Sequence, residues 1–279
     1  MKNLLFRYDM TLLFDAPVSG QSFTLRCVPR SDTCQTVRVD RISVFPKESL
    51  SEGTDSFGNF YLFGSARDAH SRFSVTVSGT AVTGLCSGLA APAPHCLGLY
   101  RMPTVLTSPG PAVRALYARC EAAMPSTLRA AAQDAFIMEG TALAAANLFM
   151  DIFRSFFSYR SGATDVRTCA EDAIALGCGV CQDYAHILLA LCRMAGIPAR
   201  YVAGMLLGEG ASHAWIEIAD HGRWYALDPT AGTAVTDGYI RLAVGRDYAD
   251  CPLNRGIFRG NARQTQQIRV SVTEETFGK

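Results

Sequence analysis

The spacing of the hydrophobic residues changes part-way along this chain, and that change limits the folds open to it. In the first 83 or so residues, apolar and polar side chains alternate, as in the stretches 23–27, 37–44 and 73–77. From Ala112 onward the apolar residues instead recur at helical spacing. Alternation is typical of strands with one buried face. The longer, helical period is typical of helices with one buried face. We therefore expect a β-rich N-terminal part followed by a part that contains helices.

The N-terminal part, residues 1–83, is expected to be an antiparallel β-sandwich. Its alternating stretches are short, and clusters of turn-forming residues such as 29–32, 51–53 and 55–59 separate them. Frequent turns between short strands favour a sandwich of antiparallel sheets. No catalytic cluster is evident here, and we expect its histidine, His70, to be a solvated turn residue. Residues 84–111 contain five prolines and several glycines, so we interpret them as a linker.

The C-terminal part, residues 112–279, is expected to be an α+β domain. Leu116 and Cys120 share one face of a first helix, and the Ala-rich, Leu-rich stretch 130–157 predicts one long or two short buried helices. Strand patterns return after Arg200, at 214–218, 225–227 and 268–272. Helices followed by strands within one stretch of chain indicate an α+β arrangement.

Composition excludes several classes of function. Near-equal numbers of basic and acidic residues give a net charge of +1, and no Lys/Arg cluster is present, so we expect no nucleic-acid partner. The most apolar stretch, 141–150, is far shorter than the ~20 residues that span a bilayer, so we expect no membrane partner. The N-terminus lacks the apolar core of a secretion signal. We therefore expect a cytoplasmic protein whose ten cysteines are reduced.

One cysteine stands at a position that favours chemistry. Thr168 and Glu171 match a capping box, which predicts that a short helix starts at residue 168 and ends at Gly177. A second, buried helix is predicted from Cys181 to the stop signals at Gly196 and Pro198. The first turn of a helix carries partial positive charge and free N–H groups, which favour a thiolate and can stabilise an oxyanion.

A cysteine nucleophile also needs a base and a group that orients the base. His213 lies near the start of one predicted strand, and Asp228 lies near the end of the next, after a short polar turn. Antiparallel pairing of these strands would place the two side chains together. His186 is nearer to Cys181 in sequence, but five residues along a helix turn it away from the sulfur. We therefore expect His213, and not His186, to be the base.

The remaining cysteines suggest less specific interpretations. Cys178 and Cys181 form a CxxC pair, which also occurs in zinc sites and redox sites. A zinc site would need a second such pair, and a redox pair would need a βαβ context, so Cys178 is expected to be a bystander thiol. We interpret the others as core or surface thiols: Cys27, Cys34, Cys86, Cys96, Cys120, Cys169, Cys192 and Cys251.

In these stretches the sequence resembles the transglutaminase-like superfamily. The matching stretches are 179–183 around the cysteine, 196–202, 212–215 around the histidine and 227–230 around the aspartate, followed by 245–248, 255–256 and 260. The first 83 residues resemble the β-domain that precedes the catalytic domain in bacterial members regarded as cysteine proteases. The resemblance implies a papain-like catalytic domain with Cys181 as nucleophile, His213 as base and Asp228 as its orienting partner. It also requires a second oxyanion donor, for which Tyr159 is a candidate.

The expected function is acyl transfer through a thioester, with a peptide, protein or small amide as substrate and with no metal or organic cofactor. Hydrolysis is preferred over cross-linking, because a chain without a calcium-site pattern better resembles the bacterial hydrolase-like members. The alternative is a catalytically silent member that binds peptides in the same cleft or serves as a scaffold. The oligomeric state is left open by the sequence.

Overall fold

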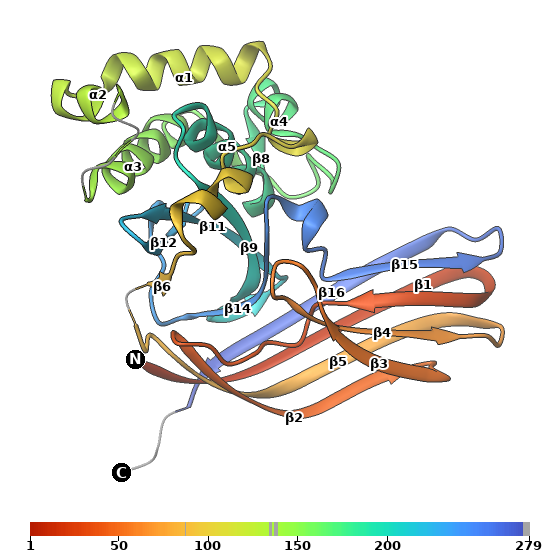
Figure 1. Ribbon diagram of the computed structural model, residues 1–279. Coiled ribbons are helices and arrows are strands. Elements are labelled where there is room, and N and C mark those ends of the chain that lie inside the picture. Colours follow the sequence, from red (N-terminus) through yellow and green to blue (C-terminus); the bar gives the residue numbers. More distant parts are fainter. Residues whose placement is uncertain (87, 134–135, 137–138, 276–279) are drawn as a thin grey trace.

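The structure, a computed structural model, describes residues 1–275 except 87, 134–135 and 137–138. It combines a large antiparallel sheet with a smaller sheet that carries a layer of helices (Figure 1). The large sheet contains β1 (Lys2–Leu25), β2 (Gln35–Phe45), β3 (Ser49–Thr54), β4 (Phe60–Ala66), β5 (His70–Thr83), β10 (Gly208–Gly210), β15 (Asn254–Arg259) and β16 (Gln264–Glu274). The smaller sheet contains β6 (Leu89–Ala90), β9 (Ala199–Leu206), β11 (His213–Asp220), β12 (Arg223–Asp228), β13 (Thr233–Ala234) and β14 (Tyr239–Gly245).

The described helices lie between residues 94 and 250, after the first five strands of the large sheet. They are α1 (Pro111–Ala123), α2 (Ser126–Gln133), α3 (Thr141–Arg154), α4 (Ala170–Leu176) and α5 (Cys181–Met194), with the short 3-10 helices η1 (Pro94–Tyr100), η2 (Val105–Thr107) and η3 (Tyr248–Asp250). A two-stranded parallel pair, β7 (Ser158–Tyr159) and β8 (Cys178–Gly179), precedes α5. The stretch 130–157, expected to hold one long or two short buried helices, contains the second half of α2 and all of α3, although residues 134–135 and 137–138 lie outside the described part.

Strand β1 organises the large sheet because it pairs on both edges along most of its 24 residues. Its first half pairs with β5 and β16, and its second half pairs with β4 and β15. The register shifts after Leu13, where the strand passes from one half of the sheet to the other. Phe23 from the second half contacts Phe73 of β5, with ring centroids 4.8 Å apart. The N-terminal antiparallel sheet region predicted from the alternating pattern is therefore confirmed.

Three segments differ from their expected places. Strand β16 contains the pattern at 268–272 that we assigned to the C-terminal sheet, yet it pairs with β1, as does β15. Residues 84–111, expected to be a linker, contribute β6 to the smaller sheet, and Tyr100 packs edge-on against Trp224 at 5.2 Å. His70 is the first residue of β5 and not a turn residue, and its Nε2 lies 2.6 Å from the side-chain oxygen of Gln21.

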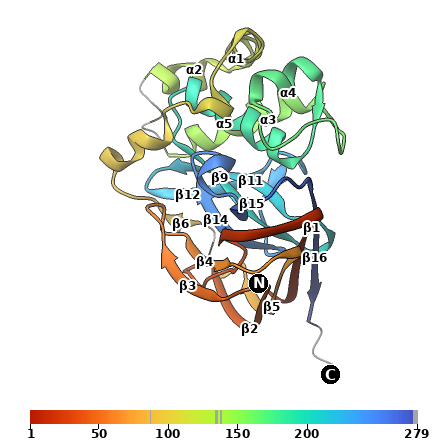
Figure 2. The same ribbon diagram turned by 90° about the vertical axis from the view of Figure 1, so that its right-hand side faces the viewer.

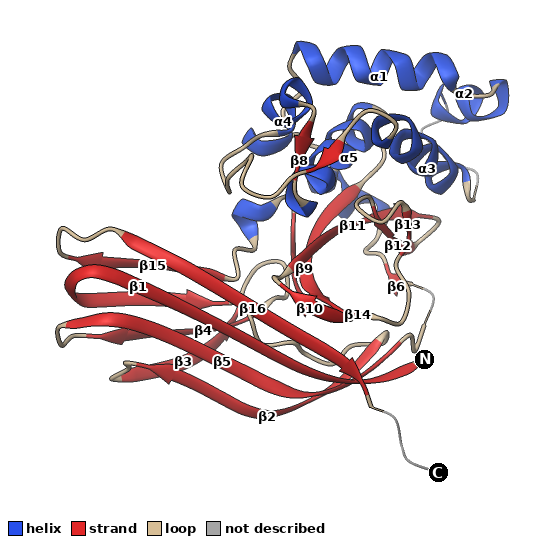
Figure 3. Cartoon of the chain, turned by 180° about the vertical axis from the view of Figure 1, so that it is seen from behind, coloured by secondary structure: helices blue, strands red, loops and turns tan. Residues whose placement is uncertain are grey.

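The smaller sheet has the strand order β13-β12-β11-β9-β14, and the helices cover one of its faces (Figure 3). Helix α5 packs against β9 and β11, and its central residues are fully buried. On β11, Ala214, Ile216 and Ile218 belong to the main core, as the alternation predicted. The same core cluster includes buried residues of the large sheet, such as Leu4 and Tyr8 of β1, so the two halves share one hydrophobic interior. Figure 2 shows the smaller sheet between the helices and the large sheet.

The helix caps differ in part from the sequence prediction. Helix α4 begins one residue later than expected, with Cys169 and not Thr168 at the N-cap, and it ends at Gly177 in a left-handed conformation, as predicted. The Glu171 carboxylate accepts hydrogen bonds from the backbone N–H groups of Ala112 (2.7 Å) and Val113 (3.0 Å) at the start of α1. It therefore caps a helix distant in sequence. Its approach requires Gly110, where a Cβ would lie 2.4 Å from the Glu171 carboxyl carbon.

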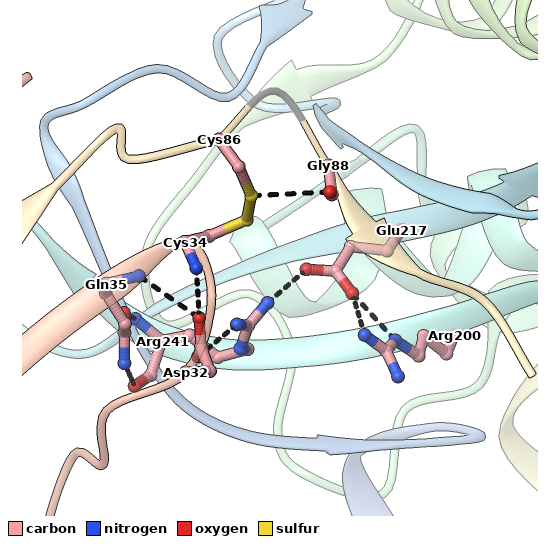
Figure 4. The surroundings of a disulfide bond; sticks show 8 residues. All are labelled: Asp32, Cys34, Gln35, Cys86, Gly88, Arg200, Glu217 and Arg241. Carbon is pink, nitrogen blue, oxygen red and sulfur yellow. Dashed lines mark hydrogen bonds and ion pairs between the residues drawn. A yellow bond between two sulfur atoms is a disulfide. The ribbon is translucent and has the colours of Figure 1, made fainter.

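Two cysteines that we expected to be reduced form a disulfide. Cys34 precedes β2 and Cys86 follows β5, and these strands pair so that Gln35 lies opposite Thr83. The pairing brings the Cα atoms of the two cysteines to 4.8 Å, which is within the range that a disulfide requires (Figure 4). The other eight cysteines are free thiols. The expectation failed because the two cysteines are 52 residues apart and only the strand pairing joins them.

Loss of this disulfide is expected to destabilise the protein. A bridge across 52 residues restricts the unfolded chain, and Cys34→Ser should lower the free energy of unfolding by about 2–4 kcal/mol. Urea unfolding with and without dithiothreitol measures the effect. The reductant should lower the free energy of unfolding of the wild-type protein and leave that of Cys34→Ser unchanged. An equal response of both proteins would contradict the prediction.

In the part of the chain that the structure describes, no helix combines the length and apolar character needed to cross a membrane.

Candidate active site

The candidate nucleophile, Cys181, is the first residue of helix α5, as predicted. The chain enters it in an extended conformation at Val180. Asp183, in the first turn, accepts hydrogen bonds from the Val180 N–H (2.7 Å) and the Thr164 hydroxyl (2.6 Å) through Oδ2. These bonds fix the loop that presents Cys181, whose own N–H lies in the first turn and is outside the ladder of the helix.

His213 and Asp228 come together from neighbouring strands, as predicted. Strands β11 and β12 pair antiparallel with Ile216 opposite Leu227, so His213 at the start of β11 lies near the end of β12. The His213 Nε2 is 2.7 Å from Asp228 Oδ2. The Asp228 side chain is almost fully buried and that of His213 is 13% exposed.

The third expected member, Cys181, interacts with the same imidazole. Burial alone would lower the pKa of His213, but the hydrogen bond to Asp228 and the contact with the Cys181 side chain raise it to about 9. Because Asp228 engages Nε2, Nδ1 is the ring nitrogen left to face the sulfur. A protonated imidazole beside a thiol favours the thiolate. The structure thus brings together all three residues that the sequence singled out.

Asp228 has a further partner that the sequence analysis missed. The Tyr239 hydroxyl, from β14, donates to Asp228 Oδ2 at 2.8 Å, and the N–H groups of Thr230 and Ala231 donate to Oδ1. Burial would raise the pKa of Asp228, but His213, Tyr239 and the backbone donors hold it below the usual range. Asp228 therefore stays ionised and faces the imidazole as a carboxylate. No sequence motif marks Tyr239, because the contact depends on how β14 pairs with β9 at the edge of the smaller sheet.

Tyr159, the candidate for the second oxyanion donor, lies near Cys181. It is the last residue of β7, which pairs in parallel with β8 immediately before Cys181. Its side chain is 56% exposed. Partial burial raises the pKa of Tyr159, and the neighbouring Cys181 adds to that shift. The phenol is therefore protonated at neutral pH and able to donate.

The other candidates lie apart from this cluster. His186 is fully buried, and burial lowers its pKa to about 3, so it does not act as a base near neutral pH. Trp224 packs in a separate cluster with Tyr100. The run 245–248, which matches the family pattern, connects the end of β14 to η3, where Tyr248 contacts Tyr201.

The CxxC pair holds neither a disulfide nor a metal cluster in the structure. Cys178 is buried on β8, and both Cys178 and Cys181 are free thiols. Within the described residues, no three His, Cys, Asp or Glu side chains gather in an arrangement that would hold a metal ion.

Comparisons with known proteins point to one family. A model of the transglutaminase-like superfamily matches residues 129–229, and a model of the bacterial transglutaminase-like N-terminal region matches residues 4–82. An uncharacterized protein of Mycobacterium leprae is 30% identical over 280 residues, covering 94% of this chain and 95% of its own. An uncharacterized protein of Mycobacterium tuberculosis is 38% identical over 137 residues, which are 43% of each chain.

A solved structure supports the fold. The "Putative Cysteine Protease" from Cytophaga hutchinsonii superposes with a TM-score of 0.77 and 22% sequence identity. The superposition covers 100% of this chain and 92% of that one. The similarity therefore includes the N-terminal sheet as well as the helical layer.

Proposed function

This chain belongs to the transglutaminase-like superfamily, and from that premise we propose that it is a cysteine-dependent acyl-transfer enzyme acting on peptide or carboxamide bonds. The observation that carries the proposal is the position of His213, which bonds Asp228 at one side of its ring and interacts with Cys181 at the other. Acyl transfer by a thiol needs at least a nucleophile, a base in contact with it and a group that orients the base.

In the proposed reaction the Cys181 thiolate attacks the carbonyl carbon and forms a C–S bond. The oxyanion is held by the Cys181 N–H and by the Tyr159 hydroxyl. As the C–N bond breaks, protonated His213 gives its proton to the departing amine, and a thioester remains. Water then adds to the thioester, His213 takes one of its protons, and the C–S bond breaks to release the acid and the thiolate.

The fate of the thioester decides between a protease or amidase and a cross-linking enzyme. We propose hydrolysis, because the chain shows no calcium-site pattern and resembles the bacterial hydrolase-like members. The proposed substrate is a peptide, a protein or a small amide. The cytoplasmic location is expected because the N-terminus lacks the apolar core of a secretion signal, and the reduced thiols are expected from that location. The Cys34–Cys86 disulfide does not agree with reduced thiols, because disulfides persist mainly in oxidising compartments.

Alkylation tests the proposal without a known substrate. With the raised His213 pKa, the imidazole stays protonated above pH 7, and a cationic group beside a sulfur is typical of reactive cysteines. Iodoacetamide at pH 6 should therefore modify Cys181 at least tenfold faster than the exposed Cys96. Peptide mass mapping over a pH series measures both rates in one sample. Equal rates below pH 7 would contradict an activated nucleophile.

A silent peptide-binding or scaffold protein of the same fold is the alternative. Thioester trapping separates the two functions: the protein is mixed with a peptide-amide library at mildly acidic pH, and adducts are found by intact mass. An acyl adduct that Cys181→Ala does not form supports the enzyme. Binding of library peptides without any adduct would instead support the scaffold.

A further inference from the structure

Strand β14, which carries Tyr239, lies at the edge of the smaller sheet, and two side-chain amides from the N-terminal part of the chain bond to it. The Gln35 amide accepts a hydrogen bond from the Arg241 N–H at 2.9 Å and donates one to the Arg241 carbonyl at 3.0 Å (Figure 4). Asn59 makes the same pair of bonds with Val244, both at 2.7 Å. Both amides are buried, and they take the place of a neighbouring strand along β14.

Tyr239 lies midway between two contacts with the large sheet. Gln35 and Thr83 face each other at the end of the β2–β5 pairing, and both are buried. Gln35 bonds Arg241, which is two residues after Tyr239. The Thr83 hydroxyl donates to the carbonyl of Asp237, which is two residues before it. The end of one strand pair in the large sheet therefore holds the chain on both sides of Tyr239.

Further contacts fix Gln35 and Arg241 relative to each other. Asp32 accepts a hydrogen bond from the Gln35 backbone N–H at 3.1 Å through Oδ1, and its Oδ2 bonds the Arg241 guanidinium (Figure 4). The same guanidinium bonds Glu217 at 2.8 Å. On the other side of β14, the register with β9 shifts between Arg241 and Ala243. A bulge disrupts the ladder locally, so the strand needs support from its outer side here, and Gln35 and Asp32 supply it.

We propose that Gln35 is a positioning residue for the active site, because by holding β14 it keeps the Tyr239 hydroxyl bonded to Asp228. That hydroxyl lies 2.8 Å from Asp228 Oδ2, the oxygen that also faces His213. A small displacement of β14 therefore disturbs the carboxylate that orients the base, and small misplacements are costly in catalysis. The large sheet is then part of the catalytic framework. The effect on rate rests on the proposed acyl transfer, whereas the link between Gln35 and Tyr239 does not.

The test compares two buried glutamines of the large sheet. Gln35→Leu removes both side-chain bonds to Arg241. Gln21→Leu is the matched control, because Gln21 is equally buried but bonds His70 of β5 and not β14. Both variants should lower the free energy of unfolding in urea. Only Gln35→Leu should lower kcat, by at least about fivefold, the effect of one hydrogen bond to a charged group. KM should stay unchanged, because the base and not substrate binding is disturbed.

A double variant shows whether Gln35 acts through Tyr239. Gln35→Leu combined with Tyr239→Phe should lose no more kcat than the larger of the two single losses, because both changes remove the same hydrogen bond. Gln35→Glu keeps the acceptor for the Arg241 N–H, so its kcat should lie between those of the wild type and Gln35→Leu. If Gln35→Leu does not fold, Gln35→Glu takes its place in the double variant. The proposal is overturned if the two losses multiply, or if Gln21→Leu lowers kcat as much as Gln35→Leu.

A measurement without substrate separates this inference from the proposed function. The ¹³Cζ signal of Tyr239, identified by its absence in Tyr239→Phe, reports the hydrogen bond that the phenol donates. Gln35→Leu should move this signal toward those of exposed tyrosines, and Gln21→Leu should leave it in place. That shift in a protein without acyl-transfer activity would support the link between Gln35 and Tyr239 and count against the proposed function alone. An unmoved signal in Gln35→Leu would overturn the inference, whatever the activity.

Discussion

Replacing Cys181 by alanine should abolish acyl transfer, with a loss in kcat/KM of about 10⁴-fold or more, since removal of a nucleophile leaves only the contributions of substrate binding and oxyanion stabilisation. The side chain is at the first position of α5 and is only partly buried, so its replacement by alanine leaves the fully buried residues of the helix in place. The readouts are kcat/KM on the best substrate from the peptide-amide library and the yield of acyl adduct by intact mass.

Two matched variants separate catalysis from the general loss of a thiol. Cys96→Ala removes an exposed cysteine far from the triad and should retain full activity. Cys178→Ala removes the buried thiol three residues before the nucleophile and should retain acyl transfer as well. An active Cys181→Ala protein, or an equal loss in Cys178→Ala, would place the chemistry elsewhere.

Asp228→Asn should have the second-largest effect on kcat/KM. It changes the His213 imidazole, on which both the formation and the hydrolysis of the thioester depend. An amide at this position removes the negative charge that Nε2 faces, so the pKa of His213 should fall from about 9 toward its ordinary value of 6.5. The expected loss in kcat/KM is about 10²–10⁴-fold, as for the corresponding change in other triads. Tyr239→Phe, which keeps the carboxylate and removes one donor, should cause a smaller loss in the same direction.

The same variant has a signature in stability. His213 has a higher pKa in the folded protein than in the unfolded chain, so its contribution to stability is present in full below pH 6.5 and is lost as pH rises through 9. The shift corresponds to roughly 3 kcal/mol in the free energy of unfolding. Urea unfolding at pH 6 and pH 9.5 should show this loss in the wild type and little of it in Asp228→Asn. NMR titration of the His213 ring gives the pKa directly, and an unchanged value in the variant would contradict the assignment.

The sequence predicted those parts of the structure whose causes are local. The start of α5 follows from glycines before it and an unbroken apolar face after it. The contact between His213 and Asp228 follows from two strands joined by a short turn, which allows one simple pairing. The grouping of Cys181 with these two residues came instead from what a thiol nucleophile needs and from the family resemblance.

The remaining features depend on contacts between distant parts of the chain. Glu171 caps α1 because the fold places α4 beside it, and a carboxylate three residues after a threonine gives the same sequence pattern as a local cap. Tyr239 reaches Asp228 only through the path of β14, and Cys34 meets Cys86 only through the pairing of β2 with β5. Strand β16 alternates like any half-buried strand, so its pattern predicts a strand without specifying which sheet it joins.

The pairing of β1 with β16 also has a consequence for biosynthesis. Leu4 lies opposite Glu274, so β1 is synthesised about 250 residues before the strand β16 with which its first half pairs. Until then, one edge of an apolar 24-residue strand stays open to pairing with other chains. Contacts between such distant residues form slowly, so we expect the native sheet to close only after β16 has been made. A nascent chain arrested before β15 should thus be protease-sensitive and bound by chaperones, and release of the full chain should end both.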